Sequence, residues 1–491
     1  MSPIRHLCLL AALLWPFHSW GESANEALVR ATAAVQSAVP RAQADPARPV
    51  FHVTSPAQWM NDPNGPLFYR GFYHLFYQLH PFSDQSGPKY WGHVRSRDLV
   101  KWEHLPIALA PSTENGESEV WSGCCTLNGN GEPMIFYTSI AQGQAPGTHA
   151  EQWAATGDAD LIHWRKSPAN PVLSEALHGG IKIYEWRDPF IFHHGKRTFM
   201  VAGGNLNHTQ GGQAVVNIYE AEDAGLTRWK YRGVLFQHPD PQVTTAECPN
   251  FFRLGDQWVL FVSPYGHVQY FLGDFDPETC RFTARSRGIM DYGSFYAPNT
   301  MLVPDGRRLV WGWINGFPDG HGWNGCLSLP RQLSLSHDGQ LRQTPAPQLA
   351  KLRGPSVKWR NLPIEQGGHD FMMPGTNSLE IEASFLLKAT NGIALEFKSR
   401  APGSKPLTIN YDGMELDVAA TKAPLRLDAR KGELNLRIFI DRSVVEVFAN
   451  DVVCITKTIP PLDADAVVNV RTAAGAVLLQ QLQVWPMRTI W

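Results

Sequence analysis

The chain has 491 residues, with 43 Lys and Arg against 45 Asp and Glu and a formal net charge of −2. This length exceeds one ordinary hydrophobic core and favours two domains. The balanced charge excludes the strongly basic surface that binds nucleic acid or an anionic membrane. The 17 Trp and 13 Tyr offer planes that stack on sugar rings, although aromatic side chains also pack the core of all-β proteins.

Residues 1–24 have the features of a secretory signal peptide. Arg5 precedes an apolar run from Leu7 to Phe17, and small residues follow that run. The run is too short to span a bilayer, and no later segment has 18 uninterrupted apolar residues. We therefore expect a secreted or periplasmic protein without a membrane anchor. Residues 25–49 follow as a lead-in or a single helix.

From residue 50 the sequence consists of short aromatic and β-branched runs separated by Gly, Asn and Asp turns. Five of these runs align as units, each with a polar start, a strand, a tight turn and a second strand. The units start at Asp62, Ser122, Asp188, Glu247 and Ala297. This spacing suits propeller blades with insertions. We predict a five-bladed β-propeller over residues 50–352, in which the polar starts converge on the central channel.

Beyond residue 352 the repeat ends and a different strand pattern begins. Segment 434–448 alternates apolar and polar residues at period two, as half-buried antiparallel strands do, and Arg442-Ser443 is a candidate hairpin turn. We predict a β-sandwich over residues 353–491. The predicted fold class is all-β, a five-bladed β-propeller followed by a C-terminal β-sandwich.

The cysteines do not indicate a metal site. An even number of them remains after Cys8 is removed with the signal peptide, but their scattered spacing defines no disulfide pairing: Cys124, Cys125, Cys248, Cys280, Cys326 and Cys454. The sequence contains neither a Cys-x2-Cys pair nor a His-Glu-x-x-His motif. We expect no metal and no other cofactor.

Three acidic residues stand at the starts of repeats. They are Asp62 in Trp59-Met60-Asn61-Asp62-Pro63-Asn64-Gly65, Asp188 in Trp186-Arg187-Asp188-Pro189, and Glu247 in Glu247-Cys248-Pro249. A lone Asp-Pro is usually a turn and a lone Arg-Asp an ion pair. Recurrence at the same phase of a repeat favours a functional interpretation, because a ring would gather the carboxylates. Carboxylates in an aromatic pocket suit glycosidic bond cleavage.

Further motifs occur in order along the chain, and with these acids they resemble glycoside hydrolase family 32, the invertases, levanases, inulinases and other β-fructosidases. The resemblance extends from Phe51 to the C-terminus. Its other motifs are Phe76-Tyr77-Gln78, Trp91-Gly92-His93, Trp102-Glu103-His104-Leu105-Pro106, Trp311-Gly312-Trp313, Leu327-Ser328-Leu329-Pro330-Arg331 and Asp441-Arg442-Ser443-Val444-Val445-Glu446-Val447-Phe448. It implies the same propeller and sandwich as the repeat pattern.

The resemblance also implies roles for individual residues. Asp62 would be the nucleophile, Glu247 the acid and then the base, and Asp188 the residue that binds fructose hydroxyls and stabilises the transition state. A retaining mechanism predicts that the carboxyl groups of Asp62 and Glu247 are about 5–5.5 Å apart. The substrate-binding residues would be Trp59, Asn61, Gln78, Trp121, Ser122, Arg187, Tyr296 and Trp313. We interpret Asp98, Glu103 and Asp441 as structural polar contacts, and Cys248 as a small buried residue that shapes the acid's environment.

Two positions depart from the family pattern. Many members have Trp eight residues after the Gln of Phe-Tyr-Gln, as an apolar wall of the fructose pocket, whereas this chain has Ser86. Another aromatic residue would rebuild the wall, or the site would be more open. The motif usually written Ser-Gly-Ser is Ser122-Gly123-Cys124-Cys125, whose adjacent cysteines would alter a hydrogen bond or form a disulfide elsewhere.

The resulting hypothesis is a secreted retaining β-D-fructofuranosidase that hydrolyses terminal β-fructosyl units of sucrose, levan or inulin. Alternatives on the same scaffold are a fructosyltransferase and an endo-fructanase. A fructan-binding protein without catalysis is disfavoured, because all three acids are present. A cytoplasmic sugar-phosphate hydrolase is disfavoured by the signal peptide. The preferred substrate, exo or endo action and the oligomeric state stay open.

Overall fold

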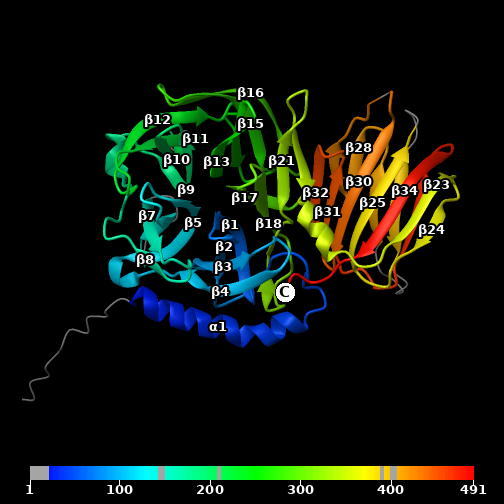
Figure 1. Cartoon of the computed structure of the whole chain (residues 1–491), viewed down its shortest axis with the longest axis horizontal. Helices are drawn as coiled ribbons and strands as arrows, with labels where there is room; N and C mark the ends of the chain where they lie inside the picture. Colours follow the sequence, from blue (N-terminus) through cyan, green and yellow to red (C-terminus); the bar gives the residue numbers. More distant parts are fainter. Residues whose placement is uncertain (1–21, 142–149, 207–211, 388–391, 399–405, 429) are drawn as a thin grey trace, which may run out of the picture.

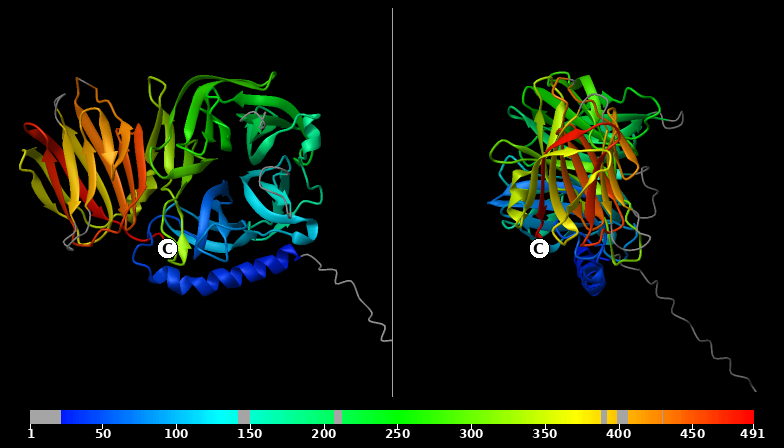
Figure 2. Two further views of the ribbon diagram at one scale, coloured as in Figure 1. Left: turned by 180° about the vertical axis from the view of Figure 1, so that it is seen from behind. Right: turned by 90° about the vertical axis from the view of Figure 1, so that its right-hand side faces the viewer.

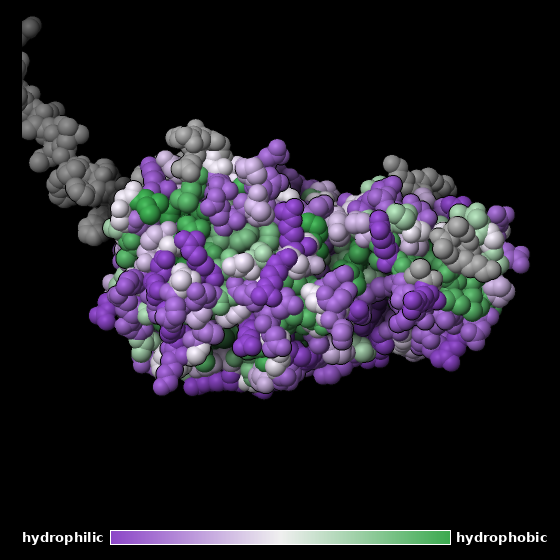
Figure 3. Space-filling model, turned by 90° about the horizontal axis from the view of Figure 1, so that it is seen from above, coloured by the Kyte–Doolittle hydropathy of each residue, from purple (hydrophilic) through white to green (hydrophobic). Residues whose placement is uncertain are grey.

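The computed structural model describes residues 22–141, 150–206, 212–387, 392–398, 406–428 and 430–491. Residues 1–21 of the predicted signal peptide therefore lie outside the described residues. The chain forms two lobes, and Figure 1 shows strands β1 to β22 in one lobe and β23 to β34 in the other. Seen from above, both lobes present a mainly hydrophilic face (Figure 3). The predicted all-β class, with a propeller followed by a C-terminal sandwich, is confirmed.

A single long helix, α1 (Ala24–Ala44), precedes the strands. Ser23 and Glu26 form a reciprocal capping box, in which each side chain accepts a hydrogen bond from the backbone N–H of the other. The buried residues of α1 are small and lie on the face toward β4 and the first sheet (Figures 1 and 2): Ala27, Ala31, Val35 and Ala42. The single-helix interpretation of the lead-in is thus confirmed. Among the described helices, none is long and apolar enough to cross a membrane.

Within the described residues the strands of the first lobe form five sheets. The first sheet contains β1 (Gln58–Tyr69), β2 (Phe72–His80), β3 (Tyr90–Ser96), β4 (Trp102–Leu109) and β19 (Trp323–Asn324). The second contains β5 (Glu117–Leu127), β6 (Pro133–Ala141), β7 (Ala150–Gly157) and β8 (Trp164–Lys166). The third contains β9 (Tyr184–His194), β10 (Arg197–Leu206), β11 (Gln213–Ala221) and β12 (Trp229–Gln237). The fourth contains β13 (Glu247–Leu254), β14 (Gln257–Ser263), β15 (Gln269–Asp276) and β16 (Arg281–Ile289). The last contains β17 (Phe295–Leu302), β18 (Arg308–Ile314), β20 (Cys326–Leu327), β21 (Arg331–Leu335) and β22 (Leu341–Pro345).

The strands β1, β5, β9, β13 and β17 surround a common centre (Figure 1). Each contacts the next, and β17 contacts β1, so that the ring is closed. The closure is reinforced by β19, which comes from the end of this lobe and pairs in parallel with β1, Gln58 opposite Trp323. Sequence-distant strand starts therefore face one another, as a propeller requires.

All five inner strands carry a β-bulge at the same place. At each bulge two residues of the inner strand oppose one residue of its neighbour, and these two fall at positions 61–62, 121–122, 188–189, 248–249 and 297–298. Proline occupies three of these bulges, where its missing N–H interrupts no ladder hydrogen bond. A bulge turns a side chain out of the regular alternation, and these five lie at the predicted polar starts.

The second lobe is a sandwich of two six-stranded antiparallel sheets. One sheet contains β23 (Val357–Ile364), β25 (Ser378–Leu386), β30 (Glu433–Asp441), β31 (Val444–Ala449), β32 (Val453–Thr458) and β34 (Val477–Pro486). The other contains β24 (His369–Met372), β26 (Ile393–Lys398), β27 (Leu407–Tyr411), β28 (Glu415–Val418), β29 (Thr421–Pro424) and β33 (Val467–Thr472). Alternate residues of the sheets, such as Ile381, Leu395 and Ile438, fill one apolar core. The predicted turn is confirmed, since Asp441 opposes Val444 around Arg442-Ser443.

Between the lobes lies a buried charge cluster of His52, Asp291, Arg331, Asp441 and Glu446. The Arg331 guanidinium contacts carboxylate oxygens of Glu446 at 2.6 Å and Asp291 at 3.0 Å, and the His52 ring lies between Asp441 and Glu446. The Asp441 carboxylate also accepts backbone N–H groups of residues 50–52 at 2.8–3.1 Å. The cluster therefore binds the N-terminal segment, the propeller and the sandwich together.

The six described cysteines are buried and free, so none forms a disulfide. Cys124 and Cys125 are adjacent on β5, and their side chains enter different apolar clusters. This follows from the alternation of side chains along a strand, which points neighbours to opposite faces. Both thiols pack the spaces between sheets, and burial raises the pKa of each.

Candidate active site

A cavity of about 540 Å³ opens at the centre of the ring, over the bulged ends of the inner strands. It is lined by all eleven residues that the sequence analysis selected: Trp59, Asn61, Asp62, Gln78, Trp121, Ser122, Arg187, Asp188, Glu247, Tyr296 and Trp313. Most of them lie in or beside a bulge, while Gln78 is on β2 and Trp313 on β18. The fold therefore brings the predicted site residues to one place.

Asp62 lies at the base of this pocket with both carboxylate oxygens hydrogen-bonded. Ser122 Oγ donates to Oδ2 at 2.6 Å, and Asn61 Nδ2 donates to Oδ1 at 2.9 Å. Asn61 Nδ2 also contacts Gln78 Oε1 at 2.6 Å, which fixes the amide. Burial raises the pKa of Asp62, and the nearby Glu247 adds to this, against the lowering effect of Ser122 and Asn61. The carboxylate is held in one orientation and incompletely solvated.

Asp188 is the second buried carboxylate. Its Oδ2 accepts the backbone N–H of Cys248 at 2.9 Å and lies 3.9 Å from Arg187 Nε. The Cys248 Sγ is 3.6 Å from Oδ2 of both Asp62 and Asp188, so the thiol separates the two carboxylates. Burial raises the pKa of Asp188 to about 7, with further raising by Glu247 and Asp62 and opposition from Arg187. Burial and the three carboxylates also raise the pKa of Cys248, which favours the neutral thiol.

Both carboxylate oxygens of Glu247 accept hydrogen bonds from residues of other strands. Arg187 Nη2 donates to Oε1 at 2.5 Å, and the Tyr296 hydroxyl donates to Oε2 at 2.6 Å. Burial and the Glu247 charge raise the pKa of Tyr296, so the phenol stays protonated as a donor. Although burial opposes it, the carboxylates of Glu247 and Asp188 hold the pKa of Arg187 well above its usual value. Arg187 also binds Tyr265 Oη at 2.7 Å and the Glu185 carboxylate.

Three bulge residues have left-handed backbones directly before proline: Asp188 (φ 61°), Cys248 (φ 47°) and Ala297 (φ 47°). Non-glycine residues in this region cost of the order of 1–3 kcal/mol each. A following proline adds restriction, since it disfavours helical backbone angles in the residue before it. Because two of the three belong to the predicted catalytic motifs, the propeller maintains strain where the carboxylates converge.

The pocket wall is polar around Ser86, the position at which the sequence departs from the family pattern. Lys89 Nζ donates to Ser86 Oγ at 2.8 Å and to the Gly87 carbonyl at 2.5 Å, and it lies 6.0 Å from the Trp59 ring centre. The Gly87 Cα approaches His80 so closely that a Cβ would lie 2.5 Å from the ring. Ser86, at the position where family members often have an indole, and Lys89 thus form a polar wall, and Trp59 and Trp313 also line the pocket and pack edge to face at 5.7 Å.

Among the other lining residues, three with an ionisable side chain were missed by the sequence analysis: Lys89, Glu119 and Tyr265. Glu119 had a signal, because it lies two residues before Trp121 on β5 and alternate strand residues share a face. Its Oε2 accepts Trp121 Nε1 at 2.9 Å. Lys89 and Tyr265 come from the loops before β3 and after β14, where no periodic sequence pattern indicates which way a side chain points.

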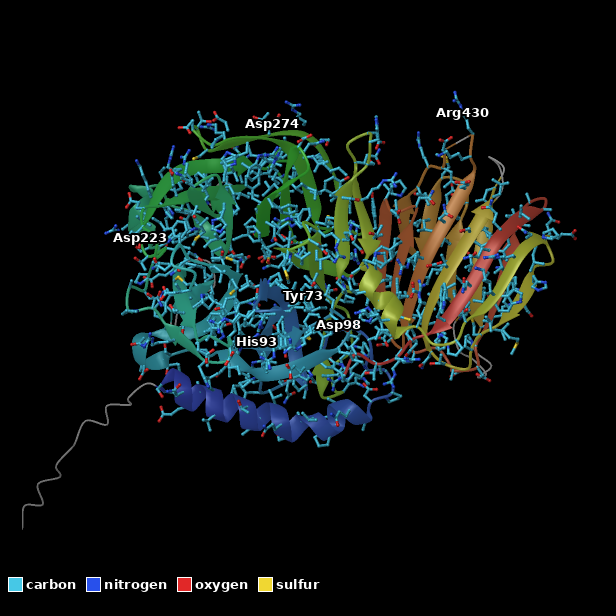
Figure 4. The ribbon with its side chains drawn as sticks, viewed as in Figure 1. Tyr73, His93, Asp98, Asp223, Asp274 and Arg430 are labelled. Carbon is cyan, nitrogen blue, oxygen red and sulfur yellow. The ribbon has the colours of Figure 1, made fainter. Side chains whose placement is uncertain are left out.

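The acidic residues interpreted as structural lie outside this pocket. Asp98 accepts backbone N–H groups of Val100 and Lys101 in the turn between β3 and β4, and Glu103 pairs with Arg95 at 2.5 Å (Figure 4). Asp441 belongs to the buried charge cluster. These interpretations are confirmed. Figure 4 also shows Asp223 and Asp274 at the outer edge of the propeller, away from the ring centre.

Comparison with known proteins agrees with this geometry. Residues 52–345 match the family described as glycosyl hydrolases family 32 N-terminal domain, and residues 348–486 match the C-terminal domain of the same family. The chain is similar to a levanase of Bacillus subtilis, 31% identical over 90% of this chain and 71% of the relative. It is also similar to a sucrose-6-phosphate hydrolase of Escherichia coli, 31% identical over 89% of this chain and 94% of the relative.

Among solved structures, a β-fructofuranosidase of Bombyx mori, determined as a mutant in complex with sucrose, superposes with a TM-score of 0.81. The two sequences are 26% identical, and the match covers 94% of this chain and 99% of that chain. Both family domains and the whole fold are therefore present. The chain belongs to glycoside hydrolase family 32 and is a glycoside hydrolase.

Proposed function

We propose that this protein is a retaining β-D-fructofuranosidase that hydrolyses terminal β-fructosyl units of sucrose, levan or inulin through a fructosyl-enzyme intermediate. The observation that carries the proposal is the joint placement of Asp62, Asp188 and Glu247 in one pocket. An indole pair beside these carboxylates suits a sugar ring, which presents both apolar faces and hydroxyls.

In the first step, an Asp62 carboxylate oxygen forms a bond to the anomeric carbon as the glycosidic bond breaks. The proton of Glu247 passes to the leaving oxygen, so that the leaving sugar departs as an alcohol. The hydrogen bonds from Ser122 and Asn61 aim Asp62 before substrate arrives. The expected separation of about 5–5.5 Å between the two carboxyl groups stays a prediction of the retaining mechanism.

In the second step, Glu247, now ionised, takes a proton from water. The resulting hydroxide oxygen bonds to the anomeric carbon, and the ester bond to Asp62 breaks, which restores both carboxyl groups. The donors Arg187 and Tyr296 hold Glu247 in place through both steps. A sugar hydroxyl in place of water would give transfer instead of hydrolysis.

Asp188 is proposed to bind fructose hydroxyls and to stabilise positive charge at the ring. Its carboxylate is positioned by a backbone N–H and the Arg187 guanidinium and does not need to form a bond. Preorganised charge in a desolvated pocket acts strongly on a cationic transition state. Together with Asp62 and Glu247 it makes the pocket floor acidic.

The proposal is tested by incubating the purified protein separately with sucrose, inulin and levan and separating the products by chromatography over time. Release of fructose alone from a polymer supports exo-hydrolysis, and the fastest substrate identifies the preference. Oligomers released from the polymer contradict exo action, and persistent fructosyl oligomers at high sucrose contradict simple hydrolysis. Absence of turnover on all three substrates overturns the proposal. The Asp62→Asn variant, prepared in parallel, controls for contaminating activity.

We also propose that the protein is exported, on the basis of the N-terminal charge and apolar run. Expression of the whole chain followed by N-terminal sequencing of the extracytoplasmic fraction tests this. Cleavage between Gly21 and Ala27 is expected. A protein retained in the cytoplasm with its first residues intact contradicts export.

Substitution of Arg187 by Gln is expected to shift the acidic limb of the pH dependence of kcat/KM toward higher pH. The guanidinium opposes the rise in the pKa of Asp188, so its removal raises that pKa above about 7. At any given pH on this limb, a larger fraction of Asp188 is then protonated in the variant than in wild type. A pH–rate profile of Arg187→Gln against wild type measures the shift. Arg95→Gln, which removes the Glu103 pair and the contact with the Phe72 ring outside the pocket, is the control. An unshifted limb contradicts the assigned coupling.

A further inference from the structure

A second cavity, of about 380 Å³, lies further along the same central channel. It is lined by later residues of the inner strands: residues 65–68, 124–126, 190–193, 251–253 and 299–302. These segments begin one to three residues beyond the bulges and run away from them, and a strand advances about 3.3 Å per residue. The second cavity therefore occupies the end of the channel away from the candidate active site, with the 59% exposed Leu302 at its rim.

The two ends of the channel differ in their charged groups. The active-site cavity is lined by four carboxylates, Asp62, Glu119, Asp188 and Glu247, and by the two cations Lys89 and Arg187. None of the residues that line the second cavity is Asp or Glu, and its lining includes Arg253 and Arg308. Arg253 is exposed and lies 3.5 Å from Asp256, so its charge is paired outside the cavity. The less exposed of the two charges is that of Arg308.

Arg308 has an incomplete set of partners. Its guanidinium lies 4.3 Å from the centre of the Phe252 ring, and Nη1 donates to Thr300 Oγ1 at 3.1 Å. Its Nε is buried and has no hydrogen-bond partner among the described residues. Burial lowers the pKa of Arg308 to about 10, which leaves the guanidinium charged at neutral pH. The side chain is only partly exposed, and a partly buried charge without an anion is costly, as is its unpaired N–H.

We propose that the second cavity binds an organic carboxylate with a small apolar body, held by Arg308. A carboxylate fits the planar fork of a guanidinium in a bidentate manner, and the terminal nitrogens of Arg308, of which only Nη1 has a hydrogen bond among the described residues, supply such a fork. The apolar side chains of Leu67, Phe190 and Trp258 line the same cavity and would contact the apolar body. An inorganic anion satisfies Arg308 but makes no use of this apolar lining. The site is separate from the proposed hydrolysis and stands whether or not that activity is found.

The test is thermal unfolding of the full chain with increasing sodium benzoate, at constant ionic strength, with neutral benzamide as the matched probe. We expect benzoate to raise Tm along a saturating curve and benzamide to leave Tm unchanged. Arg308→Gln should abolish the benzoate effect, and Arg253→Gln should retain it. Hydrolytic kcat and KM should be the same in Arg308→Gln as in wild type, because the site is at the other end of the channel.

Equal shifts with benzoate and benzamide, or an equal benzoate shift in Arg308→Gln, overturn the proposal. A wild-type Tm that does not respond to benzoate also overturns it. A phosphate or chloride effect that depends on Arg308 and matches that of benzoate assigns the site to inorganic anions and overturns the carboxylate class. If Arg308→Gln does not fold, the comparison of benzoate with benzamide on wild type still decides the outcome.

Discussion

Replacement of Asp62 by Asn is expected to lower kcat on sucrose or fructan by at least about 10³-fold, a loss in the upper part of the range for a single group acting in the transition state. The amide keeps the shape that Ser122 and Asn61 surround but cannot form the ester to the anomeric carbon. Substrate binding should largely persist, since the indoles and Arg187 are untouched. Single-turnover and steady-state rates measure the change, and near-wild-type activity would falsify the nucleophile assignment.

A smaller substitution makes this test more specific. In Asp62→Gly, azide can enter the vacated space and attack the anomeric carbon while Glu247 protonates the leaving oxygen. The expected product is fructosyl azide of inverted configuration, identified by NMR. Rescue with retained configuration contradicts the role of Asp62. Asp98→Asn, in a turn outside the pocket, should leave kcat unchanged.

Neutralising Glu446 in the buried charge cluster is expected to have the largest effect on stability. Its two oxygens accept hydrogen bonds from Arg331 at 2.6 Å and from the Leu329 backbone at 2.7 Å, and His52 lies 3.0 Å away. All three side chains are fully buried. Glu446→Gln leaves a buried guanidinium with fewer anions, and removal of one partner of such a pair costs about 3–5 kcal/mol. Urea unfolding followed by tryptophan fluorescence measures the free energy.

The control for this variant is Arg285→Met. Arg285 pairs with Asp274 at 2.5 Å, but these side chains are 73% and 53% exposed. An exposed pair contributes about 0–1 kcal/mol, so the variant should unfold nearly as wild type does. If Glu446→Gln is as stable as Arg285→Met, the cluster does not hold the lobes together.

The pH dependence of unfolding gives an independent measure of the same cluster. Burial lowers the pKa of His52, but its bonds to Asp441 and Glu446 outweigh this and raise the pKa from 6.5 to about 9. The protonated ring therefore stabilises the fold fully below about pH 6.5, and the contribution is lost as pH rises through about 9. In Glu446→Gln this alkaline loss should be smaller, because one anionic partner is gone.

The propeller and sandwich were predictable because both depend on patterns that repeat. The polar starts recur at one phase of the repeat, and the fold places the eleven selected residues in one pocket. The helix α1 was foreseen only as an alternative, although Ser23 and Glu26 have the spacing of a capping box. Its start at Ala24 falls inside a segment that composition assigned to the signal peptide.

The pocket wall was not predictable, because loops without a period form it. Lys89 follows Gly87 in this loop, and the close approach of Gly87 to His80 is a tertiary contact. Tyr265 reaches it from a turn with a left-handed backbone (φ 57°). The second cavity was also missed, since the absence of Asp and Glu from the later residues of five separate strands becomes visible only after the ring is closed.

The hydrogen bonds from the backbone of residues 50–52 to Asp441 affect the order in which the chain folds during synthesis. Val50 leaves the ribosome 391 residues before Asp441. At about 5–20 residues per second, this interval lasts roughly 20–80 s. Throughout that time the backbone N–H groups of residues 50–52 lack their carboxylate, and His52 lacks both of its anions. The first residues of the enzyme body are therefore among the last to reach their final contacts.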